Sequence, residues 1–241
     1  MGQASRRVSL RSIDLPLVRE LDLFAEMEEA NFDELMQAAF LQRFPPQVQL
    51  ITEGDPADFL YIMVEGGVEL FAANGGRETS IEIMRPVTTF ILAAVLRDAP
   101  FLMSGRTVES SKILMVPSEN VRAIFARDQV FARAVVRELA ARYRGVVKSL
   151  KSHKLRNAVE RLANYLLRTE TEQGGTGVVQ LQIDKRTLAA LLGMTPENLS
   201  RAFVTLKPYG VEVSGREIRL TKIDDLRSLA KPSPLIDDPT T

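Results

Sequence analysis

One segment of this 241-residue chain restricts the possible folds more than any other. It runs from Lys185 to Leu206 and reads KRTLAALLGMTPENLSRAFVTL. Two short helical patterns meet there at Gly193, which is suited to a tight turn. Ala189 and Leu199 occupy places where one helix of such a pair faces the other. The spacing predicts a helix-turn-helix, and three further positions are expected to be buried between the helices: Leu188, Leu192 and Val204.

Signals on both sides of this segment extend the motif to a winged helix-turn-helix. Thr195 is a good capping residue for the second helix, and Pro196 suits its first position, where an N–H has no partner to lose. A strand is expected over 178–183, and a hairpin over 211–214 and 217–220. The hairpin predicts the wing.

The first half of the chain changes from a helical to an extended pattern near residue 40. Apolar residues recur every three or four positions up to Phe40. Beyond Phe44, short β-branched or alternating runs are separated by glycines and Pro86, which is typical of a small sandwich or barrel. The expected strands are 48–52, 59–64, 68–72, 80–84 and 108–116. The fold class predicted for the whole chain is α+β: an N-terminal β-roll, a long helix and the winged domain.

A long helix is expected over 118–150, with Ser118 as its N-cap. Its second half carries apolar residues at alternating steps of three and four, which is a heptad-like seam. Two interpretations stay open: the seam pairs with the same helix of a second copy, or it packs on the roll of its own chain. The seam residues are Val136, Leu139, Tyr143, Val146 and Leu150.

These patterns predict four parts: helices and a β-roll over 1–117, a dimerisation helix over 118–150, the winged domain over 151–231 and a disordered tail over 232–241. The net charge of zero hides an asymmetry, because residues 151–231 hold 14 Lys and Arg against 9 Asp and Glu. A basic third on an otherwise acidic chain favours a nucleic acid partner. No apolar run approaches the length of a membrane span, so a cytoplasmic protein without membrane contact is expected.

Three side chains near the start of the second helix are predicted to read DNA bases: Glu197, Ser200 and Arg201. Arginine matches a guanine edge, glutamate accepts from cytosine N4, and serine serves either. The N-terminal part of a recognition helix is the part that reaches the major groove. Contacts with the DNA backbone are predicted for Lys185, Arg186, Thr187, Thr195 and Arg216. The partner is therefore double-stranded DNA.

The order of roll, long helix and winged domain resembles the Crp/Fnr superfamily of bacterial transcription regulators. The likeness covers about residues 15–230 and includes Glu53-Gly54-Asp55 and the strand pair LYIMVEGGVEL over 60–70. The face formed by Glu197, Ser200 and Arg201 is similar to the reading head of the Fnr type. This resemblance implies a homodimer that contacts RNA polymerase and a two-fold site of the type TTGAT, four bases, ATCAA.

The chain departs from that family where cyclic nucleotides bind. Members that bind them carry a Gly-Glu pair and an Arg-Ser pair, whereas this chain reads FILAAVL over 90–96 and PFLMS over 100–104. A buried cyclic phosphate would have no partner there, so cyclic AMP is not expected to bind. With no cysteine in the chain, the iron–sulfur cluster of Fnr is not expected either.

The apolar wall that remains has two interpretations: a pocket for heme or another apolar small molecule, as in heme-dependent relatives, or simply the core between roll and helix. The wall consists of Phe90, Ile91, Leu92, Leu96, Phe101, Leu102 and Met103. The polar segment 148–158 is expected to be a hinge, and His153, the one histidine, lies in it and is a poor candidate for an iron ligand. In the first case an effector controls DNA binding; in the second the protein is constitutively active.

An alternative function from another class is a roll that senses a signal and regulates a partner protein, with the winged domain as a protein-interaction module. An enzyme is not expected, because no nucleophile and base can be assembled around a single hinge histidine, and no metal site is predicted. Carboxylate pairs such as Asp224-Asp225 lie on polar helix faces.

Overall fold

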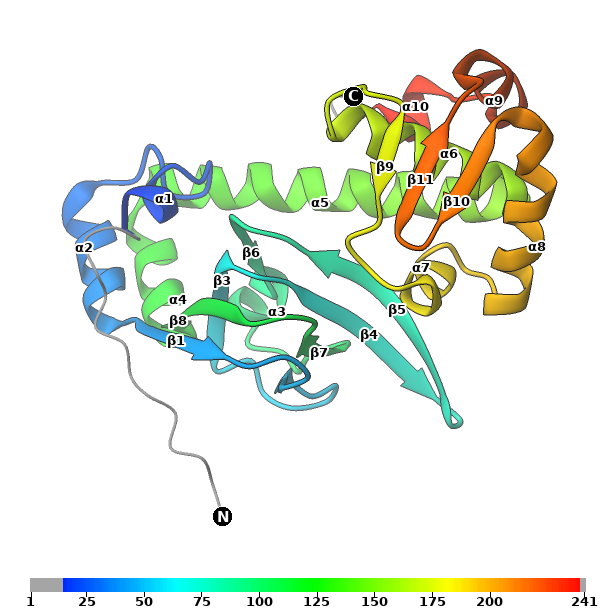
Figure 1. Ribbon diagram of the computed structural model, residues 1–241. Helices are drawn as coiled ribbons and strands as arrows, with labels where there is room; N and C mark the ends of the chain where they lie inside the picture. Colours follow the sequence, from blue (N-terminus) through cyan, green and yellow to red (C-terminus); the bar gives the residue numbers. More distant parts are fainter. Residues whose placement is uncertain (1–14, 239–241) are drawn as a thin grey trace. The chain divides into compact units, whose positions relative to one another are not determined.

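The computed structural model describes residues 15–238, and the chain divides after Arg142 into two compact units (Figure 1). Helix α5, Gln129–Leu155, runs through the boundary between them. The first unit contains the expected β-rich domain, and the second contains the helix-turn-helix. The predicted α+β fold is confirmed.

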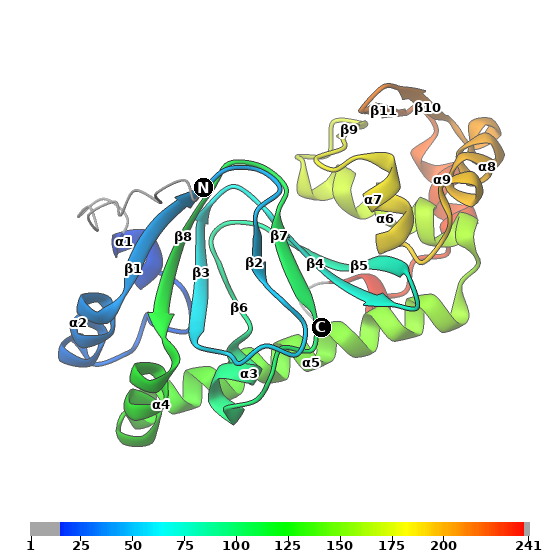
Figure 2. The same ribbon diagram turned by 90° about the horizontal axis from the view of Figure 1, so that it is seen from below.

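The first unit is built around two four-stranded antiparallel sheets, whose strands are labelled in Figure 2. One sheet has the order β1 (Phe40–Phe44), β8 (Ser111–Pro117), β3 (Phe59–Glu65) and β6 (Thr88–Phe90). The other has the order β2 (Gln49–Ile51), β7 (Ser104–Thr107), β4 (Val68–Asn74) and β5 (Arg77–Met84). Both sheets contribute to one hydrophobic core, to which β3 gives five consecutive buried residues. Such a continuous apolar run is typical of a strand covered on both faces.

Four shorter helices belong to the same unit: α1 (Leu15–Arg19), α2 (Glu29–Ala38), α3 (Leu92–Arg97) and α4 (Ser118–Arg127). Phe24, between α1 and α2, stacks on Phe131 of α5 with ring centroids 6.0 Å apart. The helical pattern was expected to reach Phe40, but Phe40 begins β1 and pairs with Met115. Residues 1–14 of the expected helical region lie outside the described residues.

The long helix expected over 118–150 is two helices, because the chain turns at Asp128 between α4 and α5. The Asp128 carboxylate accepts hydrogen bonds of 2.9 Å from the backbone N–H groups of Val130 and Phe131. It thus satisfies donors that the first turn of α5 leaves unpaired. The helix then continues to Leu155, beyond the predicted end.

The second unit holds α6 (Ala158–Glu172), α7 (Lys185–Leu191), α8 (Pro196–Leu206) and α9 (Ile223–Ala230). A small antiparallel sheet has the order β10 (Val211–Ser214), β11 (Glu217–Leu220) and β9 (Val178–Gln180). The predicted winged helix-turn-helix is confirmed, with both hairpin strands at the expected residues. Its core is formed by fully buried leucines on four helices: Leu162, Leu166, Leu188, Leu206 and Leu226.

The tail expected to be disordered over 232–241 contains a further short helix, α10 (Pro234–Asp237). Asp237 fixes it, because its carboxylate accepts from Ser233 N–H at 2.7 Å and from the Arg156 guanidinium. Composition did not reveal this partner, since Arg156 lies 81 residues earlier in the chain. Residues 239–241 lie outside the described part of the chain.

Candidate nucleic-acid interface

Helix α8 has one buried face and one exposed face. Thr195 caps the helix by accepting from Asn198 N–H at 3.2 Å, and Pro196 occupies the first position, as predicted. The buried face consists of Leu199, Ala202, Phe203 and Leu206. The exposed face contains all three predicted base-reading residues, Glu197, Ser200 and Arg201. The prediction that these three side chains share one exposed face is therefore correct.

Neighbouring groups interact with two of these side chains, Arg201 and Glu197, in the unbound protein. The Arg201 guanidinium donates to the Asn198 side-chain oxygen at 2.8 Å. The pKa of Glu197 is lowered, first by a hydrogen bond from its own backbone N–H, then by Thr195, with a contribution from the charge of Arg201. Glu197 is thus a carboxylate at neutral pH and can only accept hydrogen bonds.

The turn between α7 and α8 is held by residues of α5 and α6 that sequence reasoning did not select. Gly193 has a left-handed φ of 62°, which glycine adopts without strain. Arg161 donates to the Leu192 carbonyl at 2.8 Å, and the His153 ring lies against Gly193. The pKa of His153 is lowered by burial and then by the Arg161 charge. The His153 ring, which is exposed on its other side, thus packs against the turn.

The five predicted backbone contacts lie in three places within the second unit. Lys185 and Arg186 are exposed at the start of α7, where the ammonium of Lys185 lies 5.7 Å from the ring centroid of Phe203. Thr187 is half-buried, and its hydroxyl donates to the capping residue Asp184 at 3.2 Å. Thr195 caps α8, and Arg216 is exposed at the tip of the β10–β11 hairpin. All except Thr187 are exposed in the unbound protein.

The seam predicted on α5 is largely unpartnered within one chain. Val136, Tyr143, Val146 and Leu150 are 55–71% exposed. Leu139 differs, because it is half-buried and packs against the core of the roll. These four large apolar side chains therefore form an exposed apolar stripe along one helix.

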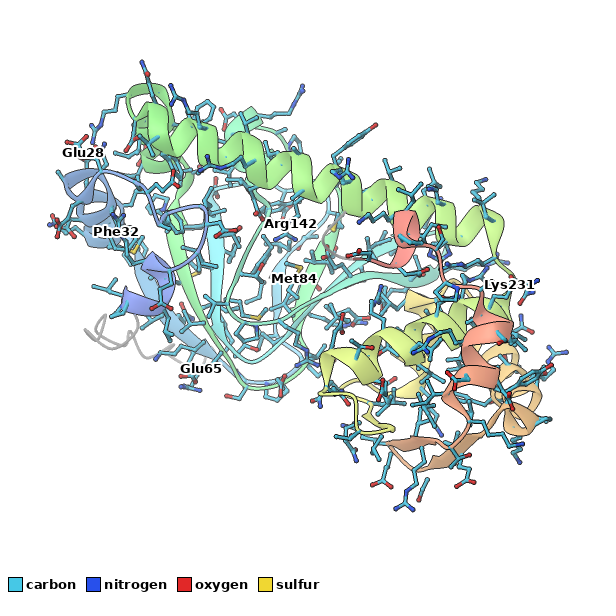
Figure 3. The ribbon with its side chains drawn as sticks, turned by 90° about the horizontal axis from the view of Figure 1, so that it is seen from above. Glu28, Phe32, Glu65, Met84, Arg142 and Lys231 are labelled. Atoms are coloured by element: carbon cyan, nitrogen blue, oxygen red, sulfur yellow. The ribbon has the colours of Figure 1, made fainter. Side chains whose placement is uncertain are left out.

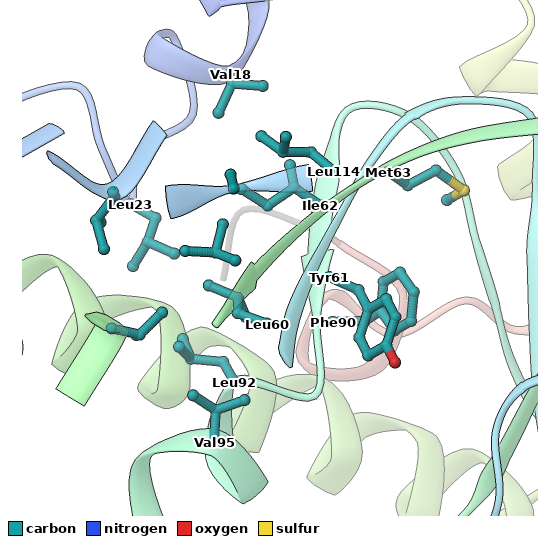
Figure 4. Close-up of a cluster of buried hydrophobic side chains, with 14 of the residues drawn as sticks. Val18, Leu23, Leu60, Tyr61, Ile62, Met63, Phe90, Leu92, Val95 and Leu114 are labelled. Carbon is teal, nitrogen blue, oxygen red and sulfur yellow. The ribbon is translucent and has the colours of Figure 1, made fainter. Parts of the chain in front are cut away.

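The apolar wall considered as an effector pocket divides between core and surface. Phe90, Leu92 and Phe101 are 3–5% exposed and belong to the core of the roll. Figure 4 shows Phe90 and Leu92 there. The Phe90 ring stacks on Tyr61 with centroids 5.1 Å apart, and burial followed by the Asp58 charge raises the pKa of Tyr61 to about 12. Leu102 is 83% exposed and does not line the interior. The remaining three, Ile91, Leu96 and Met103, pack on the core partly buried.

Arg142 links α5 to the strands beside this region (Figure 3). Its guanidinium donates to Thr89 O at 2.8 Å and to Thr88 Oγ1 at 3.1 Å, both on β6. It also pairs with Glu138 one turn earlier at 2.9 Å and lies 3.6 Å from Glu82 of β5. No local pattern reveals this contact, because it joins residues 53 and 54 positions apart in the chain.

Two other kinds of site were sought over the described residues. Between residues 15 and 238, no cluster of three or more His, Asp or Glu side chains has the arrangement of a metal site. Within that same range, none of the helices combines the length and apolar character that crossing a bilayer requires.

Two family models match the chain in the order of its units. A cyclic nucleotide-binding domain matches residues 41–128, and a Crp-like helix-turn-helix domain matches residues 160–229. The second range contains most of α6, then α7, α8 and the wing, and most of α9.

Relatives and solved structures agree with these matches. The chain is 29% identical over 180 residues to the cyclic AMP receptor protein of Thermus thermophilus, covering 74% of this chain and 82% of the relative. It is 25% identical over 194 residues to a CRP-like cAMP-activated global transcriptional regulator of Mycobacterium tuberculosis, covering 78% and 87%. The structure of FixK2 from Bradyrhizobium japonicum shares the fold, with a TM-score of 0.70, 22% identity and coverage of 81% and 98%.

Proposed function

Because this chain belongs to the Crp/Fnr family of transcription regulators, we propose that it binds a two-fold symmetric DNA site as a homodimer. The observation that carries this proposal is the exposed face of α8, where Glu197, Ser200 and Arg201 lie within five consecutive residues. The proposed site is a TTGA-type palindrome, at which the bound dimer contacts RNA polymerase.

Each of the three side chains suits a different feature of the major groove. Arg201 donates two hydrogen bonds to a guanine edge once it leaves Asn198. Glu197 accepts from cytosine N4, because its lowered pKa keeps it ionised, and Ser200 contacts a neighbouring base. A carboxylate is repelled by phosphates, so its place on this face favours base reading over backbone contact. Arg186 and Arg216 are cations that would fix the register on the backbone.

Dimerisation is proposed through the exposed apolar side chains of α5. Burying Val136, Tyr143, Val146 and Leu150 against the same helix of a second copy removes their surface from water. A two-fold dimer presents two α8 helices, and a palindrome requires them about 34 Å apart, one turn of DNA. The dimer thus supplies the symmetry that the site demands.

The roll is not expected to bind a cyclic nucleotide. The first segment, 90–96, holds neither the Gly nor the Glu, and the second, 100–104, has apolar residues where the arginine should stand; Leu92 of the first lies in the core and Leu102 of the second is exposed. Neither supplies a charge or hydrogen bond for a phosphate. A heme or other apolar effector would have to displace Phe90 and Phe101 from the core, so we propose that DNA binding does not need a small molecule bound there.

The test of base reading compares Arg201→Ala with Arg227→Ala on a palindromic TTGA duplex and on a scrambled duplex. Arg227 is a matched control, because it is a surface arginine of α9 that pairs with Asp224. Arg201→Ala should lose about 1–3 kcal/mol of binding free energy and the preference for guanine at its position. Arg227→Ala should bind as the unaltered protein does. Equal affinity of the unaltered protein for both duplexes would overturn the proposal and favour a protein partner.

The same titrations test the nature of the interaction and the effector. Affinity should fall steeply as salt rises, because lysine and arginine displace counterions from DNA. Cyclic AMP should leave the affinity unchanged, and added heme should leave the visible spectrum that of free heme. Tighter DNA binding with cyclic AMP would contradict the proposal for the roll.

A further inference from the structure

Val204 is the exposed large apolar side chain of α8. The sequence pattern predicted it between the two helices, but Phe203 occupies the buried position and Val204 is 61% exposed. A valine so exposed gains little of the stabilisation that burial gives to an apolar side chain. Folding of the domain does not use this side chain.

The helical repeat places Val204 on the face proposed to read bases. Glu197 and Val204 are seven residues apart, so they lie nearly above one another, with Ser200 and Arg201 between them. Along the helix axis the separation is roughly 10 Å, about three base-pair steps. Val204 therefore adds an apolar side chain to the same face as the polar trio of Glu197, Ser200 and Arg201, nearer the carboxyl end of α8.

We propose that Val204 contacts the C5-methyl group of a thymine in the major groove; this inference rests on the proposed function. That methyl group is the one apolar feature that base pairs present there. A β-branched side chain has one preferred rotamer in a helix, so Val204 loses little entropy when it is covered. The hydroxyl of the neighbouring Thr205 already donates to Arg201 O at 3.0 Å. The methyl groups of Val204 are therefore the groups at this end of the helix that we expect to contact a base.

The contact determines specificity in a way that hydrogen bonds do not. Glu197, Ser200 and Arg201 read donors and acceptors, which thymine and uracil share. Val204 alone on this face distinguishes the two, since they differ by the methyl group. The substitution of uracil for thymine therefore isolates Val204 from the polar trio.

The experiment replaces each thymine of the palindromic site by uracil, one position per half-site at a time, and measures the dissociation constant. For the unaltered protein, uracil at one position should weaken binding about 3- to 10-fold, since one buried methyl group is lost. With Val204→Ala, binding to the thymine site should weaken similarly, and uracil at that position should have no further effect. Because Val204 is exposed and alanine favours helices, this variant should fold.

Val213→Ala is the matched control, because Val213 is an exposed valine of the wing in the same domain. It should keep the full sensitivity to uracil. An identical uracil pattern in the unaltered protein and Val204→Ala would overturn the inference, as would sequence-specific binding with no sensitivity to uracil. Failure of the proposed function looks different: scrambled and palindromic DNA would bind equally before any uracil is introduced.

Discussion

Arg156 and Asp237 form a two-bond ion pair that fastens α10 to the link between α5 and α6. The guanidinium donates to the two carboxylate oxygens at 2.7 and 2.5 Å, and the side chains are 7% and 21% exposed. Lys148 of α5 donates to Asp238 O at 2.6 Å, which adds a second contact between the same segments. The carboxyl-terminal segment thus restrains the residues that connect the long helix to the winged domain.

Asp237→Asn should release α10 from the link. The substitution leaves the Arg156 guanidinium without its carboxylate in a largely buried place, which is costly until the segment moves away and water enters. The substitution should lower the stability of the protein by no more than the free energy that detaches α10 from this segment, about 1–2 kcal/mol. Hydrogen exchange should increase at residues 155–158 and 234–238. Asp224→Asn, whose side chain is 96% exposed, is the control and should leave exchange there unchanged.

Asp128 should make stability depend on pH in the acid range. Burial opposes its ionisation, but hydrogen bonds from Phe131 N–H, Asn31 and two further backbone groups lower its pKa in the folded state. A lowered pKa means that the stabilisation is present above pH 4–5 and is lost as pH falls through the folded-state pKa. Urea unfolding should show Asp128→Ala about 1–2 kcal/mol less stable at pH 7 and a smaller difference near pH 3. A difference that stays constant with pH would contradict a role for the charge.

The local signals in the sequence predicted most of the fold. Gly193, Thr195 and Pro196 act within a few residues of where they stand, so α7, α8 and the turn between them follow directly. Contacts between distant residues were not predictable. Asn31 donates to the Asp128 carboxylate from 97 residues away, and Arg156 binds Asp237 from 81 residues away.

The candidate interface could be predicted where it depends on local signals, and could not where it depends on contacts between distant residues. Helical spacing placed Glu197, Ser200 and Arg201 on one exposed face, because that face depends on the helix alone. The same spacing misplaced Val204, since two adjacent apolar residues, Phe203 and Val204, compete for one buried position and the larger ring fills it. Arg161, which holds the turn, has no local pattern to reveal it.

Val146→Glu should convert the proposed dimer to monomers. Val146 is 66% exposed in one chain, so the substitution leaves the monomer stable, but each dimer would bury two unpaired carboxylates. Sedimentation should show the dimer weakened at least about 100-fold. Val130→Glu, near the start of α5 and off the seam, is the control and should stay dimeric. Leu139 is unsuited to this test, because it packs on its own roll. A Val146→Glu protein that sediments as a dimer would exclude the seam.

Three glycines of the winged domain, each with a left-handed φ, should differ in their tolerance of alanine. At Gly215 a Cβ would meet no atom within 4 Å, so only backbone strain remains, about 1 kcal/mol. At Gly193 the Cβ would lie 2.7 Å from the His153 ring, an exposed side chain that can move, so the loss should be about 1–2 kcal/mol. At Gly210 the Cβ would lie 2.5 Å from the backbone nitrogen of Lys222, which cannot move without shifting the chain. Gly210→Ala should therefore cost the most, about 3 kcal/mol or more. Thermal unfolding of the three variants measures the order, and a Gly210→Ala protein as stable as Gly215→Ala would show that this close approach does not exist in solution.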